Sequence, residues 1–238
     1  MKSTIPSTHL LRHFVLFAFV ALFLLTMIRA GYGLWQFPAV VESEAWYTLF
    51  LTGLRYDVAL IGGLLLVPVV LGPLLGMIGI TRLISKSFIV IWLMFALGYI
   101  LVTEFVTPYF ILESGIRPDL AIIAETEEPV VAAMGFVSRH FVPALIGILL
   151  MLMIFLAYGR RLEVSRLLAH RLSVGSSLAL VILGAAACLL AIRSEYDPGK
   201  PALSPGSSLI AKETLINEMS MNTGYKLAYS AIQPYFIK

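Results

Sequence analysis

The sequence predicts an all-α membrane protein with five transmembrane helices and a short extracytoplasmic helical tail. Composition is the first observation behind this prediction: 59% of the 238 residues are hydrophobic and only 13% are charged, whereas soluble domains contain about a quarter charged residues. The second observation is that the sequence contains five apolar stretches, each long enough to cross a bilayer, for which a helix needs roughly 20 apolar residues. Strands of a transmembrane β-barrel would alternate in hydrophobicity instead of forming unbroken apolar runs, so a barrel is excluded.

The predicted spans form a transmembrane domain of residues 1–193. Arg29 interrupts the first span, and Ile28-Arg29-Ala30 is not a small-x-small cleavage site, so we expect an uncleaved helix rather than a signal peptide. The second span is rich in Gly and Pro, and its Gly72-x-x-x-Gly76 spacing favours close helix packing. In chain order the predicted spans cover residues 14–35, 58–80, 87–112, 141–158 and 173–192.

The basic residues predict the orientation, because Lys and Arg are enriched in cytoplasmic loops. With the amino terminus inside, eight basic residues and the single acid Glu163 fall on the cytoplasmic side. The opposite loops are rich in carboxylates, so the tail after Arg193 is expected outside. The basic residues are spread over loop ends and do not form one patch, which argues against nucleic acid as a partner. The eight basic residues are Lys2, Arg12, Arg82, Lys86, Arg160, Arg161, Arg166 and Arg171.

Charged residues near the predicted outer helix ends form the candidate site. Glu104 is the least expected of them, because two more helical turns follow it, and an ionisable residue inside a span marks a functional site by default. We expect Arg55 or Arg29 to bind it, and the group to hold a lipid headgroup. The alternative is that the arginines snorkel at helix ends with carboxylates as partners. The candidate headgroup-binding residues are Arg29, Arg55, Asp57, Glu104 and Arg117.

No single apolar segment contains a paired set of buried charges, which argues against a transporter with a proton relay. The lone Cys188 lies in the fifth span, so no disulfide framework can form within the chain. His, Cys, Asp and Glu show no metal-ligand spacing in the tail. We therefore expect neither a metal site nor a catalytic residue in these 238 residues.

Short helices are expected outside the spans. In the loop of residues 113–140 the pattern predicts one helix at 120–125 and another at 129–136, which lies along the bilayer surface or packs against other spans. Residues 194–238 form an extracytoplasmic linker and short helices. There the pattern predicts one helix at 207–220, a stop at Asn222-Thr223-Gly224, and another helix at 225–232.

Three stretches, in this order, resemble one family: GLRYD at 53–57, RPD at 117–119 and NEMSMNTGY at 217–225. Together with five spans and an outside tail, they are similar to the amino-terminal half of lipoteichoic acid synthases and phosphoglycerol transferases. The resemblance covers essentially the whole chain. It implies a bacterial cytoplasmic (inner) membrane and a following extracytoplasmic sulfatase-like domain with a threonine nucleophile and a divalent metal, Mn or Mg. That domain transfers glycerol phosphate from phosphatidylglycerol.

The chain departs from the family pattern because it ends at Lys238, where that domain begins. Thr214 and Thr223 have no neighbouring base in the sequence pattern and are not assigned as the nucleophile. We therefore expect the membrane domain alone to be inactive, with the sulfatase-like domain supplied in cis or in trans. The alternative is a stand-alone anionic-lipid-binding or sensor subunit without catalysis.

Overall fold

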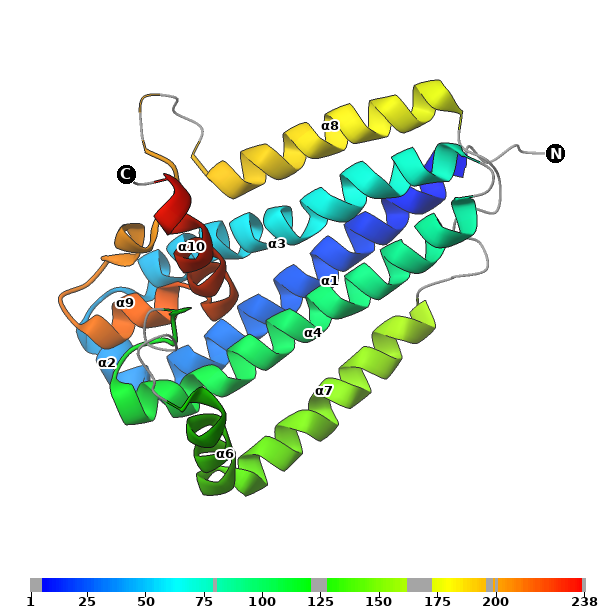
Figure 1. The fold of residues 1–238 in the computed structure, drawn as a ribbon. Coiled ribbons are helices and arrows are strands. Elements are labelled where there is room, and N and C mark those ends of the chain that lie inside the picture. Colours follow the sequence, from blue (N-terminus) through cyan, green and yellow to red (C-terminus); the bar gives the residue numbers. More distant parts are fainter. Residues whose placement is uncertain are drawn as a thin grey trace. The chain divides into compact units, whose positions relative to one another are not determined.

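The computed structural model describes residues 6–78, 81–120, 128–161, 173–195, 199 and 201–236, and the regular structure of these residues is entirely helical (Figure 1). In chain order the α-helices are α1 (Pro6–Trp35), α2 (Phe37–Glu42), α3 (Trp46–Met77), α4 (Arg82–Ser114), α6 (Pro129–Arg139), α7 (Phe141–Arg161), α8 (Val174–Arg193), α9 (Thr214–Ser220) and α10 (Thr223–Phe236). A short 3-10 helix, η1 (Pro205–Ser208), precedes α9.

Four helices are long and apolar enough to cross a membrane: Leu10–Trp35, Trp46–Met77, Leu83–Ser114 and Val174–Arg193. A shorter apolar stretch, Ala144–Arg160, lies in α7. Length and composition thus give the architecture of a multi-pass membrane protein. The predicted all-helical membrane fold is confirmed in this form, with four clear candidate spans among the described residues.

Several helix boundaries differ from the predicted ones. The α3 helix begins at Trp46 instead of Val58, so Asp57 lies inside the helix, where a partner compensates its charge. The predicted tail helix at 207–220 is divided into η1 and α9. The predicted stop at Asn222 instead begins α10: its side-chain oxygen accepts a hydrogen bond from the Tyr225 N–H at 2.7 Å, as an N-cap does. Most of the helix expected at 120–125 lies outside the described residues.

The chain divides into two compact units, and the first comprises Met1–Leu24, Val58–Gly98 and Phe155–Ala202. In this unit α3 and α8 approach closely at Gly62, where an added Cβ would lie 2.8 Å from the Ala191 Cβ. The Trp92 indole donates to the Leu64 carbonyl at 2.7 Å, which joins α4 to α3. Gly62 thus allows α3 and α8 to pack closely, whereas an added Cβ at Gly72 of the predicted Gly72-x-x-x-Gly76 spacing would lie 2.8 Å from the Ile89 side chain.

The second unit comprises Leu25–Asp57, Tyr99–Ile154 and Leu203–Lys238. The tail, residues 203–236, folds here against the adjoining parts of α1, α3 and α4, and Figure 1 shows α9 and α10 beside them. All the predicted headgroup-binding residues belong to this unit. Its apolar core joins α9 to α1, α2 and α3 through Tyr32, Val40, Ala45, Leu49, Ile216 and Met219.

Candidate functional site

A buried ion pair joins α1 to α3. Two nitrogens of the Arg29 guanidinium donate to the two Asp57 carboxylate oxygens at 2.5 and 2.7 Å, and the side chains are 4% and 0% exposed. This bidentate geometry is the strongest form of an arginine–carboxylate contact. Gly53 lies one turn before Asp57 on the same helical face, and an added Cβ there would overlap the guanidinium. In the GLRYD stretch, Gly53 leaves space for the Arg29 guanidinium and Asp57 binds it.

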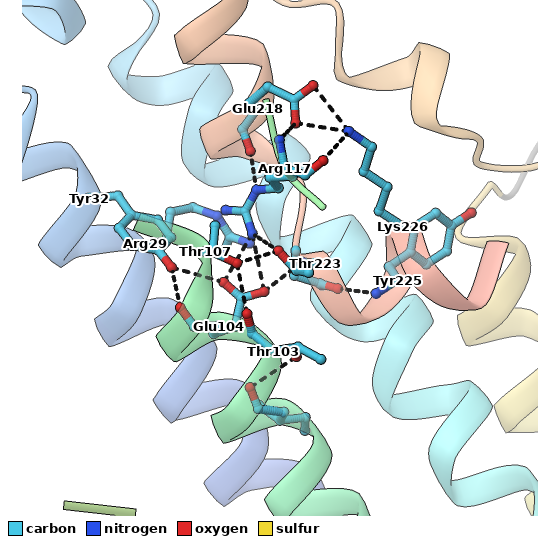
Figure 2. Close-up of polar contacts among 12 residues, drawn as sticks. Arg29, Tyr32, Thr103, Glu104, Thr107, Arg117, Glu218, Thr223, Tyr225 and Lys226 are labelled. Carbon is cyan, nitrogen blue, oxygen red and sulfur yellow. Dashed lines mark hydrogen bonds and ion pairs between the residues drawn. The ribbon is translucent and has the colours of Figure 1, made fainter. Parts of the chain in front are cut away.

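A second buried pair joins α4 to the loop that follows it. The Arg117 Nη1 donates to both Glu104 oxygens at 3.1 and 3.2 Å, and Figure 2 shows the two side chains enclosed by their partners. The carboxylate also accepts the Thr223 N–H at 2.6 Å and the Tyr32 hydroxyl at 3.3 Å. The expected partners of Glu104 were Arg55 or Arg29, and that expectation is wrong: Arg117 and the tail supply the hydrogen bonds.

Arg117 connects this pair to α9 and α10. Its backbone N–H donates to a Glu218 carboxylate oxygen at 3.0 Å, and its Nε donates to the Glu218 carbonyl. The Lys226 ammonium donates to the Arg117 carbonyl at 3.1 Å and to Glu218 at 3.2 Å (Figure 2). Pro118 follows Arg117 and favours an extended backbone at that residue. One arginine thus bonds to α4 and to both tail helices.

The tail reaches both carboxylates directly. The Asn222 side-chain amide donates to Asp57 at 3.0 Å while its oxygen caps α10. The Thr223 hydroxyl accepts from Arg117 at 2.8 Å and lies 2.5 Å from the Thr107 hydroxyl. Because Asn222 bonds to Asp57 and the Thr223 N–H bonds to Glu104, the start of α10 links the two ion pairs.

Three tyrosines fix the backbone on either side of these contacts. Tyr56 donates to the Ser204 carbonyl at 2.7 Å, and Tyr99 donates to the Gly224 carbonyl at 2.9 Å. Tyr225 donates to the Leu203 carbonyl at 2.7 Å. Burial raises the pKa of the Tyr225 hydroxyl, so it remains protonated and keeps this donor role throughout the physiological range.

We call Arg29, Asp57, Glu104 and Arg117 the charged cluster. It contains two cations and two anions, so the formal charges balance. Arg29 and Asp57 form a buried pair between two helices, which the helix-by-helix prediction missed. Arginine stays protonated in proteins, so these pairs do not suggest a proton relay.

The structure brings four of the five predicted residues together in this cluster. The fifth, Arg55, lies on α3 and is only partly buried. Sequence reasoning missed several polar residues around this cluster, although the density of polar residues at 217–226 and the tyrosine at the end of the first span were signals. These are Tyr32, Thr107, Glu218, Asn222, Thr223 and Lys226.

An exposed ion-pair group lies apart from the charged cluster in the same unit. Arg139, at the end of α6, donates to the Glu113 carboxylate at 3.0 and 3.1 Å, and the two side chains are 59% and 38% exposed. The hydrogen bonds that Arg139 donates to the Glu113 carboxylate raise the pKa of the guanidinium. His140 lies 3.0 Å from the same carboxylate. This exposed ion-pair group serves as a control for substitutions in the buried charged cluster.

No protein-family model matches this chain, and no solved structure matches it. Among the residues that the structure describes, no three His, Cys, Asp or Glu side chains gather as metal ligands would. The charged cluster and its contacts with the tail are therefore the features of the described residues that bear on function.

Replacing Arg117 by Gln should reduce the free energy of unfolding by about 3 to 5 kcal/mol, because it leaves the buried Glu104 carboxylate without its cation. Thermal unfolding in detergent, followed by tryptophan fluorescence, measures the change. Arg139→Gln is the matched control and should have little effect, because exposed ion pairs contribute little. The double variant Arg117→Gln/Glu104→Gln should recover part of the loss. Equal effects of Arg117→Gln and Arg139→Gln would contradict the structural role of Arg117.

Proposed function

We propose that this chain is the membrane domain of a phosphoglycerol transferase-like protein, similar to lipoteichoic acid synthases. In this role it anchors and orients an extracytoplasmic sulfatase-like domain, present in cis or in trans, which transfers glycerol phosphate from phosphatidylglycerol. The divalent metal, Mn or Mg, belongs to that domain. The proposal includes five spans, with α7 as the fourth, a cytoplasmic amino terminus, and a bacterial inner membrane.

One observation carries the proposal: the three stretches that resemble the family meet at the charged cluster. Gly53 and Asp57 hold Arg29, Arg117 holds Glu104, and the stretch at 217–225 supplies Glu218, Asn222 and Thr223. Buried polar contacts fix orientation, because each donor and acceptor permits few alternative geometries. A tail that is fixed by buried polar contacts suits a domain that orients an attached catalytic domain. A free linker would leave that orientation open.

A second candidate function is a stand-alone subunit that binds anionic lipid. The partly buried Arg55 favours this candidate, because it lies near exposed apolar side chains such as Leu51 and Leu54, which are 44% and 41% exposed. Arg29 and Arg117 are at most 4% exposed, so a headgroup would be contacted mainly through the more exposed Arg55. Headgroup binding also serves the first candidate, as presentation of the lipid donor.

Replacing Arg55 by Gln should weaken retention of phosphatidylglycerol about tenfold. A charge-assisted hydrogen bond contributes about 1.5 to 3 kcal/mol, and 1.4 kcal/mol corresponds to a factor of about ten. Native mass spectrometry of detergent-extracted protein reports the retained lipid. Arg139→Gln, checked for equal yield and melting temperature, is the control and should retain lipid as the wild type does. Equal retention by all three proteins would remove lipid presentation from the proposal.

Orientation is tested by cysteine labelling in intact cells, in a Cys188→Ala background. A cysteine at the exposed Ser207 should react with a membrane-impermeant maleimide, because the tail is proposed to lie outside. A cysteine at Ser165, in the basic segment between the fourth and fifth proposed spans, should react only after lysis. The reverse pattern would overturn the orientation, and with it the placement of the sulfatase-like domain.

A further inference from the structure

The length of α7 indicates how deep in the bilayer the charged cluster lies. This helix has 21 residues, or about 31 Å at 1.5 Å per residue, and the hydrocarbon core is about 30 Å thick. If α7 crosses the bilayer, as in the proposed topology, its whole length is needed to span the hydrocarbon core. Its first residue, Phe141, then lies at the lipid–water interface. His140 and Arg139 contact Glu113 just before the end of α4. The end of α4 therefore lies at the same interface.

Glu104 precedes Glu113 by two and a half turns of α4, or about 13 Å along the helix axis. A second contact gives a similar depth independently. Phe105 packs against Gly147, where an added Cβ would overlap the Phe105 ring. Gly147 lies about 9 Å inside α7 from Phe141. Both helices place Glu104 among the acyl chains.

The tail must reach the same depth. The Thr223 N–H bonds to Glu104 at 2.6 Å, and the Gly224 carbonyl accepts from Tyr99, which lies further along α4 from the interface. The turn between α9 and α10, residues 220–224, is also shielded, since Ser220, Met221 and Asn222 are at most 2% exposed. Irregular backbone at membrane depth is tolerated where protein covers it.

The α6 helix has the features of a segment that lies at the lipid–water interface. The α6 helix ends at Arg139 and exposes Val131, Met134 and Val137, which are 60%, 68% and 49% exposed. Its only described basic residue is already paired with Glu113. An apolar face beside a neutralised charge fits the boundary between headgroups and acyl chains, where amphipathic helices lie. This surface continues into the exposed Phe141 and Val142 of α7.

We propose that the α9–α10 turn is a re-entrant segment: it enters the acyl layer between α1, α3 and α4 and returns to the same side, while the apolar face of α6 rests on lipid at the interface above it. The inference depends on the proposed five spans but not on their orientation. A re-entrant turn ties the position of α10 to helix packing inside the bilayer. Whatever follows α10 is then aligned to the membrane by contacts about 10 Å below its surface.

Depth is tested with a fluorescent NBD probe on single cysteines in the Cys188→Ala protein, reconstituted into vesicles with nitroxide quenchers at defined acyl positions. Val102 is 52% exposed on the face of α4 opposite Glu104, so it reports the depth of the cluster. Its probe should be quenched most strongly by mid-chain nitroxides. Probes at Leu112 and Met134 should be quenched most strongly by headgroup nitroxides, and a probe at Ser207 by aqueous iodide.

Quenching of the Val102 probe by iodide, or at the same depth as Leu112, would overturn the re-entrant turn. A Met134 probe that is quenched by iodide alone, or shielded from every quencher by protein, would overturn the lipid contact of α6. Neither quenching result depends on which side of the membrane Ser207 and Ser165 are labelled from. Failure of the re-entrant turn can therefore be distinguished from failure of the proposed orientation.

A disulfide test places the turn itself. Thr107 and Thr223 have hydroxyl oxygens 2.5 Å apart, so the Thr107→Cys/Thr223→Cys pair should form a disulfide almost completely on mild oxidation of native membranes. The pair Thr107→Cys/Ser207→Cys is the control and should remain reduced. Absence of the first disulfide in protein that melts as the single variants do would overturn the placement of the turn against α4 at Thr107.

Discussion

The buried carboxylate of Glu104 is the constraint on which the arrangement of the second unit depends. Moving an ionised carboxylate out of water costs several kcal/mol unless it is paired and hydrogen-bonded. Its partners come from three places far apart in the sequence: Tyr32 in α1, Arg117 in the loop after α4, and the Thr223 backbone in the tail. Satisfying this one group therefore requires the loop and the tail to fold back onto the helices.

The same requirement explains what the sequence could and could not predict. Long apolar runs determine spanning helices almost by themselves, so α7 and α8 begin and end within three residues of their predicted bounds. Charge alone also selected Arg29, Asp57, Glu104 and Arg117. The pairing could not be predicted, because several arginines lie near the helix ends and only the folded backbone decides which one reaches Glu104. The early start of α3 was missed for a related reason: Asp57 looked like a helix end until its partner was known.

Buried ion pairs are weak evidence for stability, since apolar replacements are often as stable. The geometry that these ion pairs and their hydrogen bonds require explains the charged cluster better than stability does. Asn222 must bond to Asp57 with one side of its amide and cap α10 with the other, and Arg117 must align with both Glu104 and Glu218. These contacts fix where α10 begins and in which direction it leaves. The proposed anchoring role requires a fixed exit direction, whereas a flexible tether does not.

The most direct test of this role is whether the tail stays bound once its covalent link to α8 is cut. A protease site inserted after Gly199 allows cleavage in detergent, and an affinity tag at the carboxyl terminus then captures the tail with whatever remains attached. We expect the helices to be retained after cleavage, and Glu104→Gln, which removes the charge that faces Arg117, to release the tail at least tenfold faster. Immediate dissociation of the cleaved wild-type protein, or equal release rates for the two proteins, would contradict a tail held by the charged cluster.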